Sequence, residues 1–302
     1  MNLIEQMQNV IENLEITIDL GNANYKMLVA DKKIIDNSNV EEVPNGTFGA
    51  YEVNEKYYLF GQGANVKYNT NKIVEEKKAL LGRALYPVAE NGQNVVITTL
   101  LPLSLYINND NKERYKELLK GKYVVSNPNG YTKTINVEEV NICCEGFSAL
   151  VTKPELLKKP IFLVDIGGVD LTGCFINRTP VVSQSFTSEK GMNIFFTELA
   201  KHLTSKLLET YTNTDSELLY NRYEELEDSL KEVIDNFSND YIQKNILKKL
   251  TDIGFKPLIH SLVFVGGGAE ALRRYLPNGE TLENAIWASV EGAELIEKRR
   301  AK

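Results

Sequence analysis

The chain has 302 residues, of which 43% are hydrophobic and 25% charged, values that are ordinary for a soluble globular protein. Its length suits two domains, and its formal net charge of −7 argues against direct binding to nucleic acid. No apolar run could span a bilayer, and the first residues lack the basic region and apolar core of a secretion signal. We therefore expect a cytoplasmic protein with no membrane partner and no direct nucleic-acid partner.

The cysteine and histidine residues indicate neither a disulfide framework nor a zinc site. The three cysteines are Cys143, Cys144 and Cys174, an odd number with two adjacent. We expect them to be reduced, with two of them buried in strands. The two histidines, His202 and His260, are expected to have no catalytic role.

The first half of the chain mixes strands with helices. Residues 1–14 place apolar side chains at helical spacing, and we expect this stripe to pack on its own domain, with a filament or membrane contact as the alternative. The next predicted elements, in order, are a β-hairpin at 15–28, a β-rich segment at 51–60, a helix at 72–86, a strand at 95–101, a charged helix at 111–119, a hairpin of 123–125 with 131–137, a strand at 140–144 and a helix from 147.

The second half repeats the hairpin and then changes character. A hairpin is predicted at 161–176, followed by a helical and heavily charged segment at 190–252, whose most charged part is expected to be a solvated face or a filament contact. A strand at 262–265 runs into Gly266-Gly267-Gly268, and a final helix is predicted from about 282 to 300. Strands mixed with helices in each half indicate an α/β fold with central sheets.

Both hairpins carry an aspartate and a glycine at a short turn. The first reads Asp19-Leu20-Gly21-Asn22-Ala23-Asn24-Tyr25-Lys26, and the second reads Asp165-Ile166-Gly167-Gly168. Glycine lets backbone amides close on phosphate oxygens, and a carboxylate at a turn can hold a hydrated magnesium ion. The repeat therefore predicts two related domains that clamp a nucleotide.

These motifs resemble the actin-like ATPase superfamily and, within it, the bacterial plasmid-segregation actins of the ParM/StbA kind. The segment 19–26 is similar to the first phosphate motif of the family, 165–168 to the second, and Val265–Ala269 to the adenosine motif. Further similarities are the strand end at Leu100-Leu101-Pro102, with Leu100 in place of a glycine, the first inter-domain connection at Cys144–Ala149, and the second at 284–292.

The resemblance departs from the family in two places. After the second phosphate motif this chain reads Val169-Asp170-Leu171-Thr172, so the usual acid is displaced and no role is assigned to Asp170 or Thr172. The segment between the second phosphate motif and the adenosine motif is compact and helical, which implies a reduced outer subdomain in the second half.

The resemblance implies an actin-like fold of two related domains, with RNase H-like sheets and helices, around a nucleotide cleft. Domain I would comprise residues 1–150 plus 283–302, and domain II residues 151–282. The implied ligands are Mg²⁺ and ATP, or GTP. Asp19 and Asp165 would hold the metal mostly through water. Glu145 and Asp165 would be the catalytic residues, with Glu145 orienting or activating the attacking water. The implied nucleotide-binding residues are Asp19, Gly21, Asn22, Asn24, Lys26, Gly167, Gly168, Lys190, Asn193, Gly266, Gly267 and Gly268.

Each of these roles has a plainer alternative. Asp19 and Asp165 could be ordinary turn aspartates, and Lys26 could be an exposed strand lysine. Glu145 could be a glutamate stabilised by the dipole of the helix that follows it.

The function implied by the resemblance is a nucleotide-dependent filament that moves plasmid DNA through a DNA-bound adaptor of the ParR kind. The negative net charge agrees with this, because contact with DNA would be delegated to the adaptor. The alternative is a sugar- or acetate-type kinase of the same fold, although no separate acceptor motif is found. A chaperone-type ATPase is not expected, because the chain ends at Lys302, directly after the last helix.

Overall fold

The computed structural model describes residues 13–61, residue 64 and residues 71–300. Most of the apolar stripe predicted at residues 1–14 therefore lies outside the described residues. The chain divides into two compact units: Met1–Cys144 with Glu297–Lys302 form the first unit, and Glu145–Ile296 form the second unit. The domain boundaries expected from the sequence, at 150 and 283, stay a prediction.

The first unit is built on one mixed sheet, whose described strands lie in the order β3-β2-β1-β7-β9-β8-β5-β6-β4. Strand β1 pairs in parallel with β7, and β7 pairs in parallel with β9, whereas the other pairs are antiparallel. The strands are β1 (Leu14–Leu20), β2 (Asn24–Val29), β3 (Lys32–Asn37), β4 (Val40–Val43), β5 (Tyr51–Val53), β6 (Lys56–Phe60), β7 (Gln93–Leu101), β8 (Gly121–Ser126) and β9 (Thr132–Cys144).

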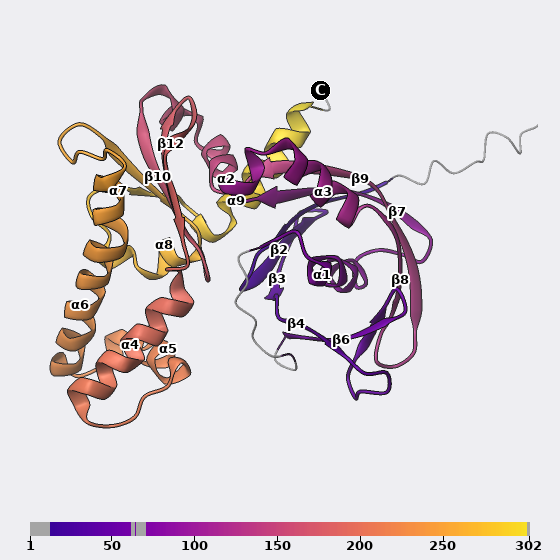
Figure 1. The fold of residues 1–302 in the computed structure, drawn as a ribbon, viewed down its shortest axis with the longest axis horizontal. Helices are drawn as coiled ribbons and strands as arrows, with labels where there is room; N and C mark the ends of the chain where they lie inside the picture. The colour runs from indigo at the N-terminus through magenta and orange to yellow at the C-terminus, as the bar shows by residue number, and fades with distance from the viewer. Residues whose placement is uncertain (1–12, 62–63, 65–70, 301–302) are drawn as a thin grey trace, which may run out of the picture. The chain divides into compact units, whose positions relative to one another are not determined.

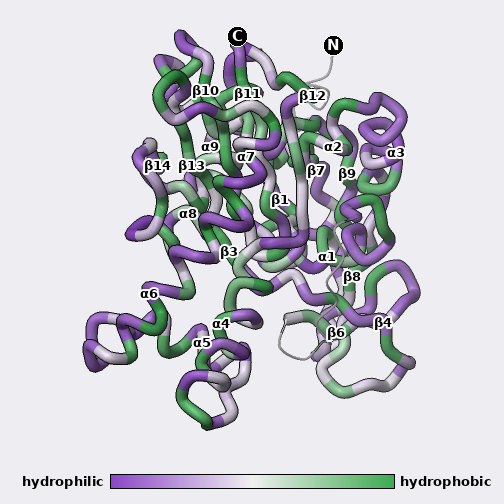
Figure 2. The backbone as a smooth tube through the Cα atoms, turned by 60° about the vertical axis from the view of Figure 1, so that its left-hand side comes forward, coloured by the Kyte–Doolittle hydropathy of each residue, from purple (hydrophilic) through white to green (hydrophobic). Residues whose placement is uncertain are grey.

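This sheet curves around helix α1 (Glu75–Leu85), which Figure 1 shows almost end-on. The apolar side chains of α1 are buried against the strands, and Gly82 allows a close approach, since a Cβ there would lie 3.0 Å from Val53 and 3.1 Å from Tyr123. Helix α2 (Leu103–Tyr106) follows β7, and helix α3 (Asn109–Leu119) is mostly hydrophilic and largely purple in Figure 2. The helices predicted at 72–86 and 111–119 are thus observed as α1 and α3.

The β-rich segment predicted at 51–60 is confirmed, whereas the two strands predicted at 131–137 and 140–144 need correction. The β-rich segment 51–60 is a hairpin of β5 and β6, because Asn54 and Glu55 both have positive φ angles and turn the chain. The strands predicted at 131–137 and 140–144 are a single strand, β9, in which a register shift places Val137 and Glu139 opposite the consecutive residues Val95 and Val96. The bulge accommodates the polar residues that interrupt the apolar pattern.

The second unit contains a smaller sheet in the order β12-β11-β10-β13-β14. Its strands are β10 (Ile161–Ile166), β11 (Leu171–Asn177), β12 (Thr179–Ser188), β13 (Ser261–Val265) and β14 (Glu280–Thr281). This order matches β3-β2-β1-β7-β9 of the first unit, with the same antiparallel pairs followed by the same parallel pairs. The two units therefore share one core topology, as the repeated hairpin predicts.

Helices make up the rest of the second unit. The helix predicted from 147 is the 3₁₀ helix η3, and the charged segment predicted to be helical contains α4 to α7. The helices are η3 (Phe147–Thr152), η4 (Pro154–Lys158), α4 (Met192–Leu207), α5 (Asn213–Asn221), η5 (Tyr223–Glu225), α6 (Asp228–Ile242), the π-helical η6 (Gln243–Leu247), α7 (Lys248–Asp252), α8 (Gly267–Ala271), η7 (Arg273–Tyr275) and α9 (Ala285–Arg300). Within the described ranges, none of the helices is long and apolar enough to cross a membrane.

All three cysteines are buried, and none of them forms a disulfide. Cys143 and Cys144 lie at the end of β9, and Cys174 lies in β11. Burial raises the pKa of Cys143 to about 11, and it raises the pKa of Cys174 to about 11 as well.

We expect the folded protein to resist thiol labelling. At pH 8 a thiol of pKa about 11 is ionised in only roughly one molecule in a thousand, and only the thiolate reacts. A chromogenic disulfide reagent should therefore label no cysteine of the native protein within minutes, and three per chain after unfolding in guanidinium. A thiol that reacts in the native protein as fast as free cysteine would contradict the buried positions.

Candidate functional site

The hairpin of β1 and β2 in the first unit brings together the first group of predicted site residues. Asp19 is paired across the hairpin with Lys26, and the turn consists of Gly21, Asn22 and Ala23. A Cβ on Gly21 would lie 2.4 Å from the carbonyl oxygen of Asn24, so the turn is too tight for any other residue to fit without movement. The glycine predicted from the motif is therefore required by the backbone.

Asp19 is buried and ion-paired on both carboxylate oxygens. Lys72 Nζ lies 2.8 Å from Oδ1, and Lys26 Nζ lies 3.5 Å from Oδ2. Burial raises the pKa of Asp19, but the nearby ammonium groups of Lys72, Lys26 and Lys77 outweigh it and hold that pKa below its usual value. The carboxylate is thus ionised and fixed in place. Lys26 is largely buried and ion-paired with Asp19, so it is not simply an exposed lysine of the strand.

Lys72 and Lys77 are site residues that the sequence did not single out. Lys77 is buried in α1 and its Nζ donates a hydrogen bond of 2.8 Å to the carbonyl oxygen of Gly21. A signal was present, because Lys77 falls on the apolar stripe of the helix, four residues after Ile73 and three before Leu80. A lysine on an apolar stripe has to reach a specific acceptor, since burying its charge is otherwise costly.

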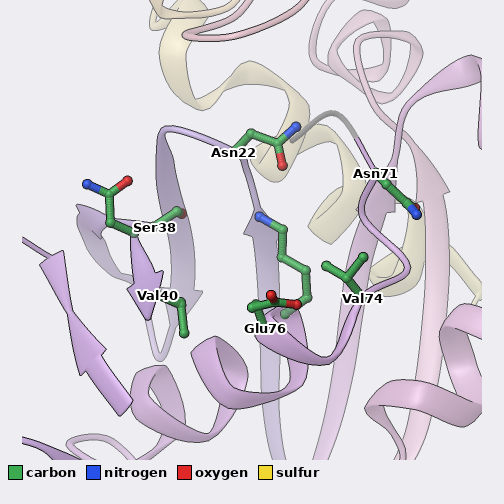
Figure 3. A pocket seen from close by; sticks show the side chains of 8 residues that line it. Asn22, Ser38, Val40, Asn71, Val74 and Glu76 are labelled. Carbon is green, nitrogen blue, oxygen red and sulfur yellow. The ribbon is translucent and has the colours of Figure 1, made fainter. Parts of the chain in front are cut away.

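A pocket of about 440 Å³, including its open mouth, lies beside this turn. Figure 3 shows its wall, with Asn22 from the turn, Ser38 from the connection between β3 and β4, Val40 from the start of β4, and Val74 and Glu76 from the start of α1. The polar Asn22 side chain therefore borders a hollow next to the hairpin.

The hairpin of β10 and β11 in the second unit carries the second group of predicted residues. Its turn is closed by a hydrogen bond from the Gly167 amide to the Asp170 carbonyl, with a distance of 2.8 Å. Three backbone amides at the start of α4 then donate to turn carbonyls: Gly191 to Val169 at 2.9 Å, Met192 to Gly167 at 3.0 Å and Asn193 to Gly168 at 2.8 Å.

These bonds give Asn193 and Gly191 a clear structural role. The first amides of a helix have no partner within the helix, and here they donate hydrogen bonds to the carbonyl groups of the turn. A Cβ on Gly191 would lie 2.6 Å from the Gly167 carbonyl oxygen and 2.6 Å from the Val169 carbonyl carbon, so α4 can reach the turn only because residue 191 is glycine.

Asp165 lies at the end of β10 between two glycines. A Cβ on Gly266 would lie 2.5 Å from Asp165 Oδ1, and a Cβ on Gly146 would lie 3.1 Å from Asp165 Oδ2. Both glycines have positive φ angles, 89° and 71°. The backbone therefore approaches the carboxylate from both sides, which only glycine permits.

Glu145 directly follows β9 and precedes Gly146, at the start of the segment that leads into η3. The Gly146 amide donates to Ser289 Oγ of α9 at 3.1 Å, and Ser148 Oγ donates to the Ser289 carbonyl at 2.8 Å. A Cβ on Gly292 would lie 1.9 Å from the Ser148 carbonyl oxygen, so α9 packs directly on the backbone here. The segment that carries Glu145 is thus bound to α9 within the second unit.

The residues predicted to contact the nucleoside lie at the start of α4 and directly after β13 in the second unit. Gly266 follows β13, and its amide donates to the Ala285 carbonyl at 3.0 Å, while Gly267 and Gly268 begin α8. Lys190 Nζ lies 2.5 Å from Glu198, so its ammonium group is paired in this structure.

Among the residues that the structure describes, no three His, Cys, Asp or Glu side chains gather into a metal site. The buried and ionised carboxylate of Asp19 is of the chemical type that binds a magnesium ion through water. The two histidines lie apart from these groups, His202 in α4 and His260 against the rings of Phe162 and Phe175.

We predict that Gly191→Ala lowers the free energy of unfolding by about 1–3 kcal/mol, because its methyl group collides with the hairpin turn. The backbone conformation of Gly191 is open to alanine, so the effect tests the contact alone. Gly267→Ala is the matched control, since its methyl group would make only an ordinary contact of 3.5 Å with Ile286. Urea unfolding measures both variants, and equal free energies of unfolding would disprove the close contact between residue 191 and the hairpin turn.

Comparison with known proteins agrees with this arrangement. Residues 17–147 match the family described as actin like proteins N terminal domain, whereas a search of the curated proteins gave no match. The archaeal actin homologue Ta0583 matches with a TM-score of 0.78 at 17% identity, covering 95% of this chain and 99% of that chain. Alp7A matches with a TM-score of 0.77 at 16% identity over 96% and 98%, and the apo pSK41 ParM with 0.68 at 19% over 96% and 99%.

The structural matches extend over nearly the whole chain, and the sequence match covers the first hairpin and Glu145. The resemblance predicted from the motifs is thereby confirmed. The chain has the actin-like fold, and its residues 17–147 match the N-terminal domain of actin-like proteins.

Proposed function

We propose that this protein is a nucleotide-dependent, filament-forming ATPase that segregates plasmid DNA through a DNA-bound adaptor. The observation that carries the proposal is shared by the two hairpins. In each of them the turn carbonyls accept hydrogen bonds from the structure behind the turn. The amide of the following residue then points the other way, because carbonyl and N–H groups are opposed in a trans peptide. Amides directed out of a glycine turn are suited to phosphate oxygens.

Proteins of the same fold support the nucleotide and the assembly. One structure of Ta0583 is a complex with ADP, and a ParM from Bacillus thuringiensis has been solved with ATP. Alp12 has been solved as a filament. We extend these properties to the present chain, in which the phosphates of ATP, or of GTP, would be shared by Gly21, Asn22, Asn24, Gly167 and Gly168.

The acidic residues would have two different roles, metal binding and orientation of the attacking water. Asp19 and Asp165 would hold Mg²⁺ through water, and the metal would supply positive charge next to the phosphates. Glu145 would orient the attacking water, which is the main task of such a group in phosphoryl transfer. Lys190 and Asn193 would contact the base or ribose, with Gly266, Gly267 and Gly268 close to the ribose and α-phosphate.

The plasmid role rests on charge and on fold. A net charge of −7 disfavours direct contact with DNA, so the filament would need a basic adaptor of the ParR kind. The likeness to ParM, Alp7A and Alp12 supports a cytomotive filament over a small-molecule kinase of the same fold.

We predict assembly that depends on nucleotide. Purified protein with Mg²⁺-ATP should form sedimentable filaments above a critical concentration and disassemble as the nucleotide is consumed. Pelleting with ATP, ADP or no nucleotide, with phosphate release followed in parallel, measures both properties. A protein that stays in the supernatant with ATP and its analogues over a wide range of concentration and salt, and that consumes ATP only with an acceptor, would be a kinase.

We further predict that Glu145→Ala separates hydrolysis from assembly. The variant should bind nucleotide and polymerise, because Glu145 acts on the water, while phosphate release slows by about 10²–10⁴-fold. Glu139→Ala, which changes an exposed glutamate of β9, the strand that precedes Glu145, is the control. Phosphate release at the control rate in Glu145→Ala would remove Glu145 from the mechanism.

A further inference from the structure

We propose that Lys77 is a positioning residue of the phosphate site, which orients the turn of the first hairpin so that the Asn22 amide points at the bound phosphate. The inference rests on the proposed nucleotide binding and adds to it a residue from outside the phosphate motifs. Lys77 belongs to α1, more than fifty residues from the turn, and its ammonium group contacts the turn through the Gly21 carbonyl at 2.8 Å.

The geometry of one peptide bond carries the argument. The bond between Gly21 and Asn22 is trans, as are all those described. Because the Gly21 carbonyl points at Lys77, the Asn22 N–H must point away from Lys77 and α1. In the same turn the Ala23 carbonyl accepts a hydrogen bond of 2.9 Å from the Ser38 amide, so the Asn24 N–H is directed away from Ser38.

The second hairpin reaches the same result by another device. There the amides of Met192 and Asn193, at the start of α4, bind the Gly167 and Gly168 carbonyls, which directs the N–H groups of Gly168 and Val169 away from the helix. In the first hairpin the Gly21 carbonyl accepts its hydrogen bond from a side chain, that of Lys77 in the first turn of α1. The two units thus share the hairpin but differ in the donor to its turn carbonyls, which is a lysine side chain in the first unit and helix amides in the second.

Burial explains why a lysine suits this position. Lys77 is 6% exposed, and a buried ammonium group is costly unless acceptors and anions compensate it. The Gly21 carbonyl supplies an acceptor at the turn itself, and bound phosphate would bring further negative charge to the same place. The neighbouring pair of Lys72 with Asp19 fixes the other end of the turn, so that Lys77 is the group that sets the direction of the peptide.

The test compares four proteins in the binding of a fluorescent ATP analogue with Mg²⁺: wild type, Lys77→Met, Lys77→Arg and Lys78→Met. Lys77→Met removes the donor at similar length and should weaken binding by about ten- to hundredfold, the usual effect of losing one charge-assisted hydrogen bond. Lys77→Arg restores a donor and should recover most of the affinity. Lys78→Met, which changes the adjacent lysine of the same helix, should bind as wild type does.

The outcomes separate this inference from the proposed function. If wild type binds no nucleotide, the proposed function fails and the inference fails with it. If wild type binds and Lys77→Met binds equally well, the inference alone is overturned. Loss of affinity in both Lys77→Met and Lys77→Arg, with unfolding free energies lowered alike, would assign Lys77 a structural role only and also overturn it. Should the Met variant not fold, Lys77→Gln, a shorter neutral side chain, replaces it in the same comparison.

Discussion

The structure depends on hydrogen bonds that hold the carbonyl groups of two hairpin turns. A glycine turn alone is flexible, and its amides could point in many directions. Here Lys77 holds the Gly21 carbonyl, and the first amides of α4 hold the carbonyls of Gly167 and Gly168. Each turn therefore has one orientation before any ligand arrives. Binding groups that are ordered in advance lose less entropy when a ligand binds, which favours affinity.

Close backbone packing then fixes Asp165 and the turn of the second hairpin. Asp165 is enclosed by Gly146 and Gly266, and Gly191 lets α4 approach the second turn. These glycines lie far apart in the sequence, at the connection after β9, at the start of α4 and after β13. A side chain at any of these positions would collide with the hairpin of β10 and β11, which is a separate segment of the sequence. Substitutions at these positions should consequently act on the site from a distance.

The hairpins and most helices were predictable from the sequence, because their apolar spacing and glycine turns are local signals. The short strands β3 and β4 were not, since their residues are largely polar and pair only through the tertiary fold. The bulge within β9 was predicted as a break between two strands, because polar residues interrupt the apolar pattern there. Lys72 and Lys77 were missed because their partners, Asp19 and Gly21, are more than fifty residues away and no motif contains them. The proposed roles of Asp19, Asp165 and Glu145 came from the family motifs.

The most direct test of the account is a map of the backbone amides that respond to nucleotide. In isotope-labelled protein saturated with Mg²⁺-ADP, the account predicts large NMR shifts of the N–H groups of Asn22, Asn24, Gly168 and Val169. The N–H groups of Met192 and Asn193, which donate to the second turn, should remain hydrogen-bonded and protected from exchange. Saturation of the protein without shifts at the turn amides, or loss of protection at the start of α4, would contradict it.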